Sequence, residues 1–271
     1  MPMEPSPLDG VALVLYQPQD VVNVAAIIRV MSNFGLSALR LVEPAAFDPE
    51  RIAGIAHHTE PIIARTRRFP TLEAALADCG LTLGTTGRPR EIERPVYAPR
   101  DAAPQILAAS SVQRVAILFG PERDGLPNAA LDRCHGIITI PTHPFNRSLN
   151  LAQAVLVVAY ETWLARLAGA QAPEAPAGLA AVGRGGRTGE APASHDQLER
   201  FYAQLEGTLL RIGYTDERRA PSVMRMFRAI FDRADLSAHE LSALRGLASQ
   251  ARWAADQPPE RLRPAPEEET G

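Results

Sequence analysis

Polar and small residues end three apolar segments that have the composition of β-strands. They are Thr85 and Thr86 in the first, Gly120 and Glu122 in the second, and the segment 141–150 after the third. In a parallel sheet, ligands bind at the carboxyl ends of the strands. The sequence contains no Walker phosphate loop, dinucleotide-binding glycine motif, nucleophile elbow or cluster of metal ligands. These strand ends are therefore candidate ligand-binding loops, and we expect no metal in them.

The third segment leads from polar residues into an apolar helix. Ser148 and Asn150 come just before a stretch, 151–159, that has almost no polar side chain. A helix that is apolar all round is expected to be buried. Polar groups at a buried helix start cost free energy unless they are paired. Ser148 and Asn150 therefore either cap this helix or hold a ligand.

Charge alone does not indicate a partner. The 271-residue chain has a formal net charge of -3, and all 28 of its basic residues are arginine. Arginine is well suited to binding phosphate. Clusters that either contact RNA or lie on a solvated face are Arg65, Arg67 and Arg68; Arg88, Arg90 and Arg94; and Arg218, Arg219, Arg225 and Arg228.

Periodicity predicts the elements that position these residues. Strands are expected at 11–16, 38–43, 81–86, 115–120 and 136–141, and helices at 23–35, 71–80, 127–134 and 149–167. Alternating strands and helices predict an α/β fold with a mainly parallel sheet covered on both faces. Gly35 and Gly80 are expected to end their helices. Neither a signal peptide nor a membrane span is expected, which predicts a cytoplasmic protein.

The chain is expected to contain two structured parts. Residues 1–167 form the α/β domain, and the Ala-, Pro- and Gly-rich segment 168–193 is a flexible linker. Residues 194–256 form a small helical C-terminal domain, with capping boxes at Ser194 and Ser237. The Pro- and Glu-rich tail, 257–271, is expected to be disordered.

Three motifs in this order resemble those of the SpoU/TrmH family of SPOUT methyltransferases. They are Asn23 with Arg29 six residues later, Leu-Phe-Gly-Pro-Glu-Arg-Asp-Gly-Leu at 118–126, and Ser-Leu-Asn-Leu-Ala at 148–152. The C-terminal helical segments resemble the extension of the TrmJ branch. The resemblance to the family implies S-adenosyl-L-methionine-dependent methylation of ribose 2′-hydroxyls in RNA, and the resemblance to the TrmJ branch implies position 32 of the tRNA anticodon loop. It also implies a homodimer and an α/β fold whose C-terminal part forms a trefoil knot.

The resemblance also implies roles for individual residues. Arg29 would stabilise the developing alkoxide, Asn23 would cap its helix and bind substrate, and Glu122 would orient Arg29 or the ribose. The expected catalytic residues are Arg29, Asn23, Glu122, Ser148 and Asn150. The expected cofactor-binding residues are Thr85, Thr86, Gly120, Ile140, Ser148 and Leu149.

Three residues depart from the family pattern. Val22 and Ala25 replace glycines of the first motif, which is expected to narrow the pocket near the ribose, and Pro121 removes an N–H donor from the second. These departures leave two alternatives open, a ribose methyltransferase for another tRNA or rRNA site and a non-catalytic RNA-binding knot protein. DNA and membranes are not expected as partners.

Overall fold

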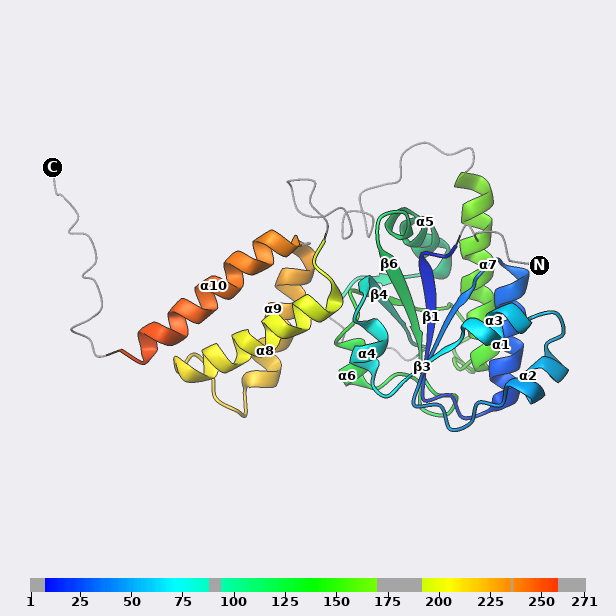
Figure 1. Ribbon diagram of the computed structural model, residues 1–271, viewed down its shortest axis with the longest axis horizontal. Helices are drawn as coiled ribbons and strands as arrows, with labels where there is room; N and C mark the ends of the chain where they lie inside the picture. The colour runs from blue at the N-terminus through cyan, green and yellow to red at the C-terminus, as the bar shows by residue number, and fades with distance from the viewer. Residues whose placement is uncertain (1–7, 88–93, 170–191, 235, 258–271) are drawn as a thin grey trace.

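A seven-stranded sheet forms the centre of the N-terminal part of the chain (Figure 1). The computed structural model describes residues 8–87, 94–169, 192–234 and 236–257. The strands are β1 (Val11–Tyr16), β2 (Ala38–Val42), β3 (Arg67–Phe69), β4 (Cys79–Thr85), β5 (Val96–Tyr97), β6 (Arg114–Phe119) and β7 (Gly136–Ile138). Their order is β3-β2-β1-β6-β4-β7-β5, and every pairing is parallel. The predicted parallel α/β sheet is confirmed.

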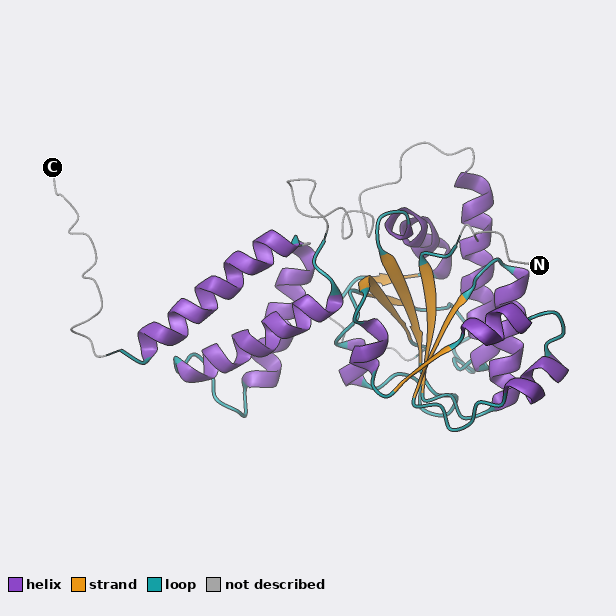
Figure 2. Cartoon of the chain, in the orientation of Figure 1, coloured by secondary structure: helices purple, strands orange, loops and turns teal. Residues whose placement is uncertain are grey.

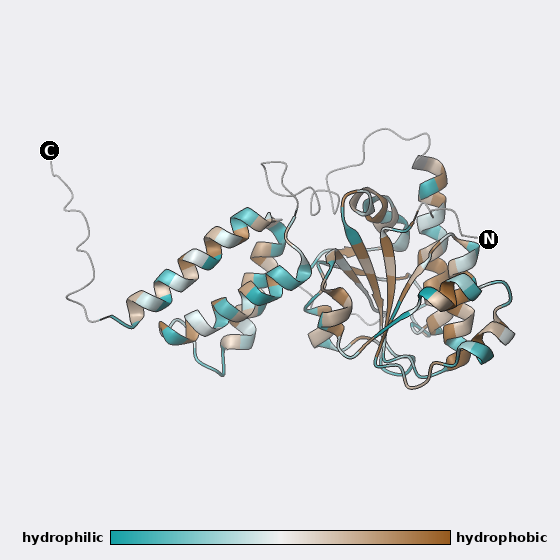
Figure 3. Cartoon of the chain, in the orientation of Figure 1, coloured by the Kyte–Doolittle hydropathy of each residue, from teal (hydrophilic) through white to brown (hydrophobic). Residues whose placement is uncertain are grey.

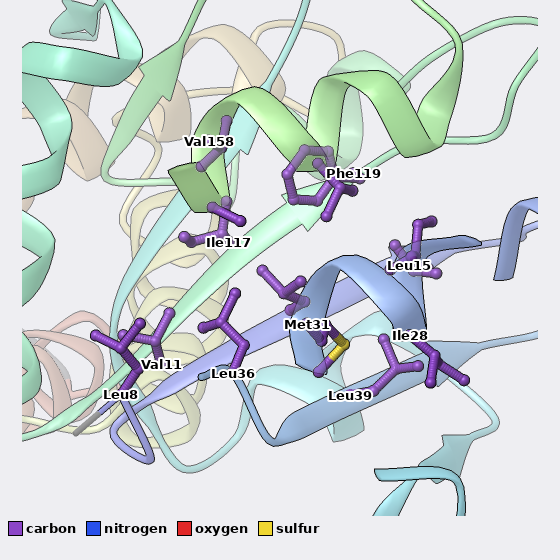
Figure 4. Packing of buried hydrophobic residues seen from close by; sticks show 14 of the residues in the cluster. Leu8, Val11, Leu15, Ile28, Met31, Leu36, Leu39, Ile117, Phe119 and Val158 are labelled. Atoms are coloured by element: carbon purple, nitrogen blue, oxygen red, sulfur yellow. The ribbon is translucent and has the colours of Figure 1, made fainter. Parts of the chain in front are cut away.

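Side chains of successive strand residues point to opposite faces, and both faces are buried. In β6, Ile117 and Phe119 belong to one apolar cluster, whereas Ala116 and Leu118 belong to the other. Figure 4 shows Ile117 and Phe119 near Val158. This burial on both faces explains why the central strands β1 and β6 are almost continuous apolar runs.

Helices cover the two faces unequally (Figure 2). The larger cluster includes residues of α1 (Val21–Asn33), α5 (Pro99–Ser110) and α7 (Leu151–Gly169). The smaller cluster lies under α4 (Leu72–Leu76) and α6 (Asn128–Leu131). Two short helices, α2 (Pro49–Ile55) and α3 (Glu60–Arg65), pack against α1.

The ends of α1 correct one expectation and confirm another. Asp20 is the N-cap, since its side chain accepts a hydrogen bond from the Val22 amide; the prediction that Asn23 caps this helix was wrong. Asn23 lies in the first turn, where its side chain is available for other partners. Gly35 ends the helix as predicted, with a φ of 67° that favours glycine.

The helix α7 is apolar all round but only partly buried in this chain. Val155 and Val158 are buried, whereas Leu156, Tyr160, Leu164 and Leu167 are exposed. By length and composition α7 is the one described helix that would suit a membrane, although only 28% of the 18-residue window is buried. Its packing against α1 and α5 is that of a core helix on one side. On the opposite side, an apolar stripe is exposed among the residues that the structure describes.

Three helices form a bundle with its own core beyond residue 191 (Figures 1 and 3). They are α8 (His195–Arg211), α9 (Ala220–Ala234) and α10 (Ala238–Ala255). Both predicted capping boxes, at Ser194 and Ser237, are present. Of the expected linker and tail, 170–191 and 258–271 lie outside the described residues.

Some elements differ from the prediction. Gly80 lies within β4 and does not end α4, because Cys79 pairs with Arg114 and the strand begins there. Five further elements, α2, α3, β3, β5 and α5, have no predicted counterpart. Four of these are short, and α5 contains Pro104 in its interior.

Candidate active site

A cavity of about 430 Å³ lies at the carboxyl ends of β4, β6 and β7. Its walls come from three loops, at 85–87, 119–125 and 138–151. The structure brings together in it all the residues expected to bind the cofactor, Thr85, Thr86, Gly120, Ile140, Ser148 and Leu149. Residues far apart in sequence meet here because parallel strands end at one edge of the sheet.

Two glycines allow the cavity loops to approach each other closely. A Cβ atom on Gly120 would lie 2.2 Å from the Leu126 amide nitrogen, a distance too short for any residue with a side chain. A Cβ atom on Gly87 would lie 2.7 Å from the carbonyl oxygen of Arg147. The loops after β4 and β6 therefore need glycine to close around the cavity.

A chain of hydrogen bonds joins three of the expected catalytic residues. The side-chain Nδ2 of Asn23 donates to Glu122 Oε1 at 3.0 Å, and Asn150 Nδ2 donates to Asn23 Oδ1 at 3.0 Å. Glu122 also accepts from the backbone amides of Gln19 and Asp20, at 3.1 and 3.3 Å. This carboxylate thus binds the amino end of α1, where the helix dipole favours negative charge. The chain links the β6 loop, α1 and the start of α7.

Arg29 is not part of this series of hydrogen bonds. It is exposed on α1, and its Nη1 donates to the carbonyl oxygen of His57 at 2.7 Å. Glu122 therefore orients Asn23 in this structure, and not Arg29, which was one of its two expected partners. Asn23 and Arg29 are six residues apart, about 1.7 helical turns, so their side chains point about 120° apart around the axis of α1 and meet different surroundings.

The polar start of α7 serves as both cap and cavity wall. Asn150 Oδ1 accepts hydrogen bonds from the amides of Ala152 at 2.9 Å and Gln153 at 3.4 Å, which satisfies two amides of the first turn. Its Nδ2 is the donor to Asn23. Ser148 is exposed, lines the cavity and makes no hydrogen bond to another described residue. Asn150 therefore has a structural role, whereas the Ser148 hydroxyl is available to a ligand.

The three departures from the family pattern have different surroundings. Ala25 is completely buried in the core, and Val22 is 44% exposed at the start of α1. Neither lines the cavity at the strand ends, and their effect on the pocket near the ribose stays a prediction. Pro121 does line it, and its carbonyl accepts the amide of Gly125 at 3.0 Å.

Several cavity residues were not predicted. Arg123, Asp124, Phe145, Asn146 and Arg147 all line the cavity, and Phe145 is 94% exposed. The available signal was their position within two segments that were already marked, 118–126 and 141–150. An exposed aromatic ring in a polar loop beside a cavity is suited to stacking on a planar ligand.

The arginine clusters contain both enclosed and exposed residues, and the exposed Arg219 is itself paired with Asp216. Arg94 forms an ion pair with Asp232 at 2.5 Å, and Arg228 binds both oxygens of Glu199. The interpretation of these two arginines as surface contacts for RNA was wrong. Their side chains are largely buried, and each is paired with a carboxylate that is distant in the sequence. Arg65, Arg67, Arg68, Arg218, Arg219 and Arg225 are exposed. Arg88 and Arg90 lie outside the described residues.

Family models match both parts of the chain. A model of the SpoU rRNA methylase family matches residues 10–160, which include the sheet, α1 and the cavity. A model of the C-terminal domain of the tRNA methyltransferase TrmJ matches residues 196–260, which include the bundle.

Full-length relatives match along almost the whole chain. The tRNA (cytidine/uridine-2′-O-)-methyltransferase TrmJ of Pectobacterium atrosepticum is 34% identical over 255 residues, 92% of this chain and 100% of the relative. The TrmJ of Salmonella typhimurium is 35% identical over 89% of this chain and 95% of its own.

Solved structures agree with these matches. The crystal structure of TrmJ from Z. mobilis ZM4 has a TM-score of 0.72 and 34% identity, covering 88% of this chain and 97% of that one. A probable methylase family protein from Haemophilus influenzae has a TM-score of 0.58 and 29% identity, covering 92% and 98%. The chain therefore belongs to the SpoU rRNA methylase family and joins that family's sheet domain to a TrmJ-type C-terminal domain.

Proposed function

We propose that this protein transfers a methyl group from S-adenosyl-L-methionine to a ribose 2′-hydroxyl of tRNA, at position 32 of the anticodon loop. The observation that carries the proposal is the cavity at the ends of β4, β6 and β7, together with the hydrogen-bonded series Glu122–Asn23–Asn150, which joins the β6 loop to the start of α7. The names of the TrmJ relatives supply the substrate class and reaction.

The cavity residues fit S-adenosyl-L-methionine. The volume of the cavity, about 430 Å³, lies in the range of small-molecule sites, roughly 300–1,000 Å³. Phe119, Ile138, Ile140, Leu149 and Leu151 offer apolar walls to a purine ring. Thr85, Thr86, Glu122 and Ser148 offer polar groups to ribose, amine and carboxylate. When bound, the cofactor supplies a methyl group activated by its sulfonium charge.

The chain's own residues hold and orient the substrate hydroxyl. Glu122 fixes Asn23, and Asn23 and Asn150 fix each other, so both amides are preorganised beside the cavity loops. The free hydroxyl of Ser148 binds ribose or phosphate. An arginine stays protonated in proteins, so Arg29 acts as a charge that stabilises the developing alkoxide, and not as a base. To do so its guanidinium must exchange the His57 carbonyl for the substrate.

We further propose that the protein is a homodimer whose interface covers the exposed stripe of α7. Leu156, Tyr160, Leu164 and Leu167 recur at helical spacing along this stripe, and Phe34 packs edge-on against Tyr160. A solvated stripe of this kind is typical of a surface that a second copy covers. A trefoil knot in the C-terminal part of the α/β domain, a cytoplasmic location and the absence of DNA and membrane partners complete the proposal.

The function is tested by supplying the purified protein with S-adenosyl-L-methionine and tRNA transcripts. Ribose methylation is mapped at single-nucleotide resolution, and a transcript with a 2′-deoxy nucleotide at position 32 serves as the matched control. We expect methylation at position 32 of the unmodified transcript only. Methylation at another nucleotide or in rRNA would favour the alternative substrate. Calorimetric binding of S-adenosylhomocysteine without any methyl transfer would favour the non-catalytic RNA-binding alternative.

The dimer is tested by light scattering. The native protein should have about twice the 29.3 kDa mass of the chain. The variant Leu164→Asp places a charge in the stripe and should give a monomer. Leu247→Asp, in an exposed position on α10, is the control and should remain dimeric. A monomeric native protein at micromolar concentration would contradict the proposal.

A further inference from the structure

The bundle contacts the sheet domain through polar groups, and none of these belongs to the proposed methyl-transfer site. Arg94, which precedes β5, has a side chain only 8% exposed, and Asp232 of α9 has one only 13% exposed. Their nearest atoms lie 2.5 Å apart. The other terminal nitrogen of Arg94 donates to the carbonyl oxygen of Asp132 at 2.6 Å. A guanidinium of the sheet domain is therefore enclosed between its own backbone and a carboxylate of the bundle.

The contact continues into the bundle as a connected set of side chains. The Tyr202 hydroxyl donates to the second oxygen of Asp232 at 3.0 Å. Arg228 lies over the Tyr202 ring, 4.2 Å from its centroid, and binds both oxygens of Glu199. These groups fix the orientation of Asp232, so Arg94 meets a carboxylate that cannot turn away.

A second contact anchors the start of α8. The amide of Asp196 donates to the carbonyl oxygen of Ala77, at the end of α4, at 3.3 Å. His195, the first residue of α8, is 3% exposed, and α8 packs against α4 and β4. The bundle therefore meets the sheet domain at two points, one on α8 and one on α9.

We infer that Arg94 and Asp232 are positioning residues that dock the bundle on the sheet domain, and that this docking sets where the RNA-binding arginines of α9 lie relative to the methyl-transfer cavity. Arg218 and Arg225 are exposed on or just before α9, the helix that carries Asp232. Arg94 follows the cavity loop that contains Thr85, Thr86 and Gly87. Docking thus joins the two surfaces that an extended tRNA would contact into one body.

Docking matters because RNA that contacts two surfaces binds most tightly when both are held at the right separation. A bundle held by a linker alone samples many positions, which lowers the effective concentration of its arginines near bound RNA. Loss of docking should therefore weaken tRNA binding while the cavity still binds its cofactor. This last step rests on the proposed function, whereas the docking itself does not.

The test uses the full-length chain with the variants Asp232→Asn and Arg94→Gln. Asp256→Asn is the matched control, because it removes an acid of an exposed ion pair inside the bundle, with Arg211. Small-angle scattering should show a larger radius of gyration than that of the native protein for the two junction variants, and no increase for the control. The KM for tRNA should rise about tenfold, with kcat and the affinity for S-adenosylhomocysteine changed less than about twofold.

Each outcome decides one part of the inference. An unchanged radius of gyration in both junction variants would overturn the docking role. A larger radius with an unchanged KM for tRNA would overturn the positioning role. If the variants do not fold, hydrogen exchange of the unmodified protein replaces them, and the Asp196 amide should be protected; exchange at the rate of an open chain would overturn docking. Absence of methyl transfer by the native protein would refute the proposed function and leave the scattering result valid.

Discussion

The surface beside α1 and the junction between the two domains hold arginine in different ways. Arg29 is exposed, and among the described residues its guanidinium donates one hydrogen bond, to the backbone carbonyl of His57. Arg94 is enclosed, with a carboxylate and a carbonyl as partners. A guanidinium with free donors can exchange its partner for a ligand, whereas an enclosed one is costly to move. The difference separates residues that meet substrate from residues that hold the chain.

The comparison is tested most strongly at Arg29. Arg29→Ala should lower the single-turnover rate of methyl transfer at least about a hundredfold, about 2.7 kcal/mol, because the developing alkoxide loses its charge partner. Arg29→Lys should not restore the rate, since a point charge cannot replace the planar fork. The affinity for S-adenosylhomocysteine should be unchanged. Arg51→Ala, an exposed arginine on α2, is the control. A near-normal rate for Arg29→Ala would show that this residue is a surface arginine.

Asn23 sharpens the comparison, because its side chain is paired and is joined to a cavity loop through Glu122. Asn23→Ala removes the hydrogen bonds to Glu122 and Asn150, so both lose orientation. The single-turnover rate should fall about tenfold, equivalent to about 1.4 kcal/mol. Asn33→Ala, at the exposed end of α1, should have no effect on the rate. If both variants react at the native rate, the hydrogen-bond chain is structural only.

At the junction, acid should weaken the native state through His195. Burial is the main cause that lowers the pKa of His195 from 6.5 to about 4. The groups around it are Glu199 on its own helix, His135, Arg228 and Arg133. His195 is neutral above pH 6.5 whether the bundle is folded or unfolded. As pH falls from 6.5 towards 4, only the unfolded form gains the proton.

Unfolding should therefore become easier by about 1.4 kcal/mol for each pH unit below about 6.5, until about pH 4. Denaturant unfolding at a series of pH values measures this slope. His195→Gln should flatten it, whereas His239→Gln, an exposed histidine on α10, should not. An equal slope in the native protein and His195→Gln would assign the acid sensitivity to other groups.

The smallest effect is expected at the exposed arginines of the bundle. Arg218→Ala and Arg225→Ala should each raise the KM for tRNA about threefold and reduce its salt dependence, because each removes one phosphate contact. Arg252→Ala on α10 is the control. Equal salt dependence in all three variants would place Arg218 and Arg225 on a solvated face.

Local patterns predict much of the sheet and mark the strand-end loops that line the cavity, whereas the roles of single residues there came from the family resemblance. The strands around Leu13 and Ile117 are nearly uninterrupted apolar runs, and the cavity lies at the carboxyl ends of β4, β6 and β7. The partner of a charged side chain is not a local property. Arg94 and Asp232 are 138 positions apart, so their pairing is set by tertiary packing. The capping role of Asp20 was hidden because Asn23, three residues later, is an equally good capping type.

The position of β1 in the sheet has a consequence for how the protein folds. On one side β1 pairs with β2, which follows closely, but on the other Val11 pairs with Val115. During synthesis, that edge of β1 stays open until about a hundred further residues have emerged, and pairings this distant slow folding. The bundle, with helices close in sequence, needs no such wait. Refolding should therefore show a fast phase from the bundle and a slow phase from closure of the β1–β6 edge.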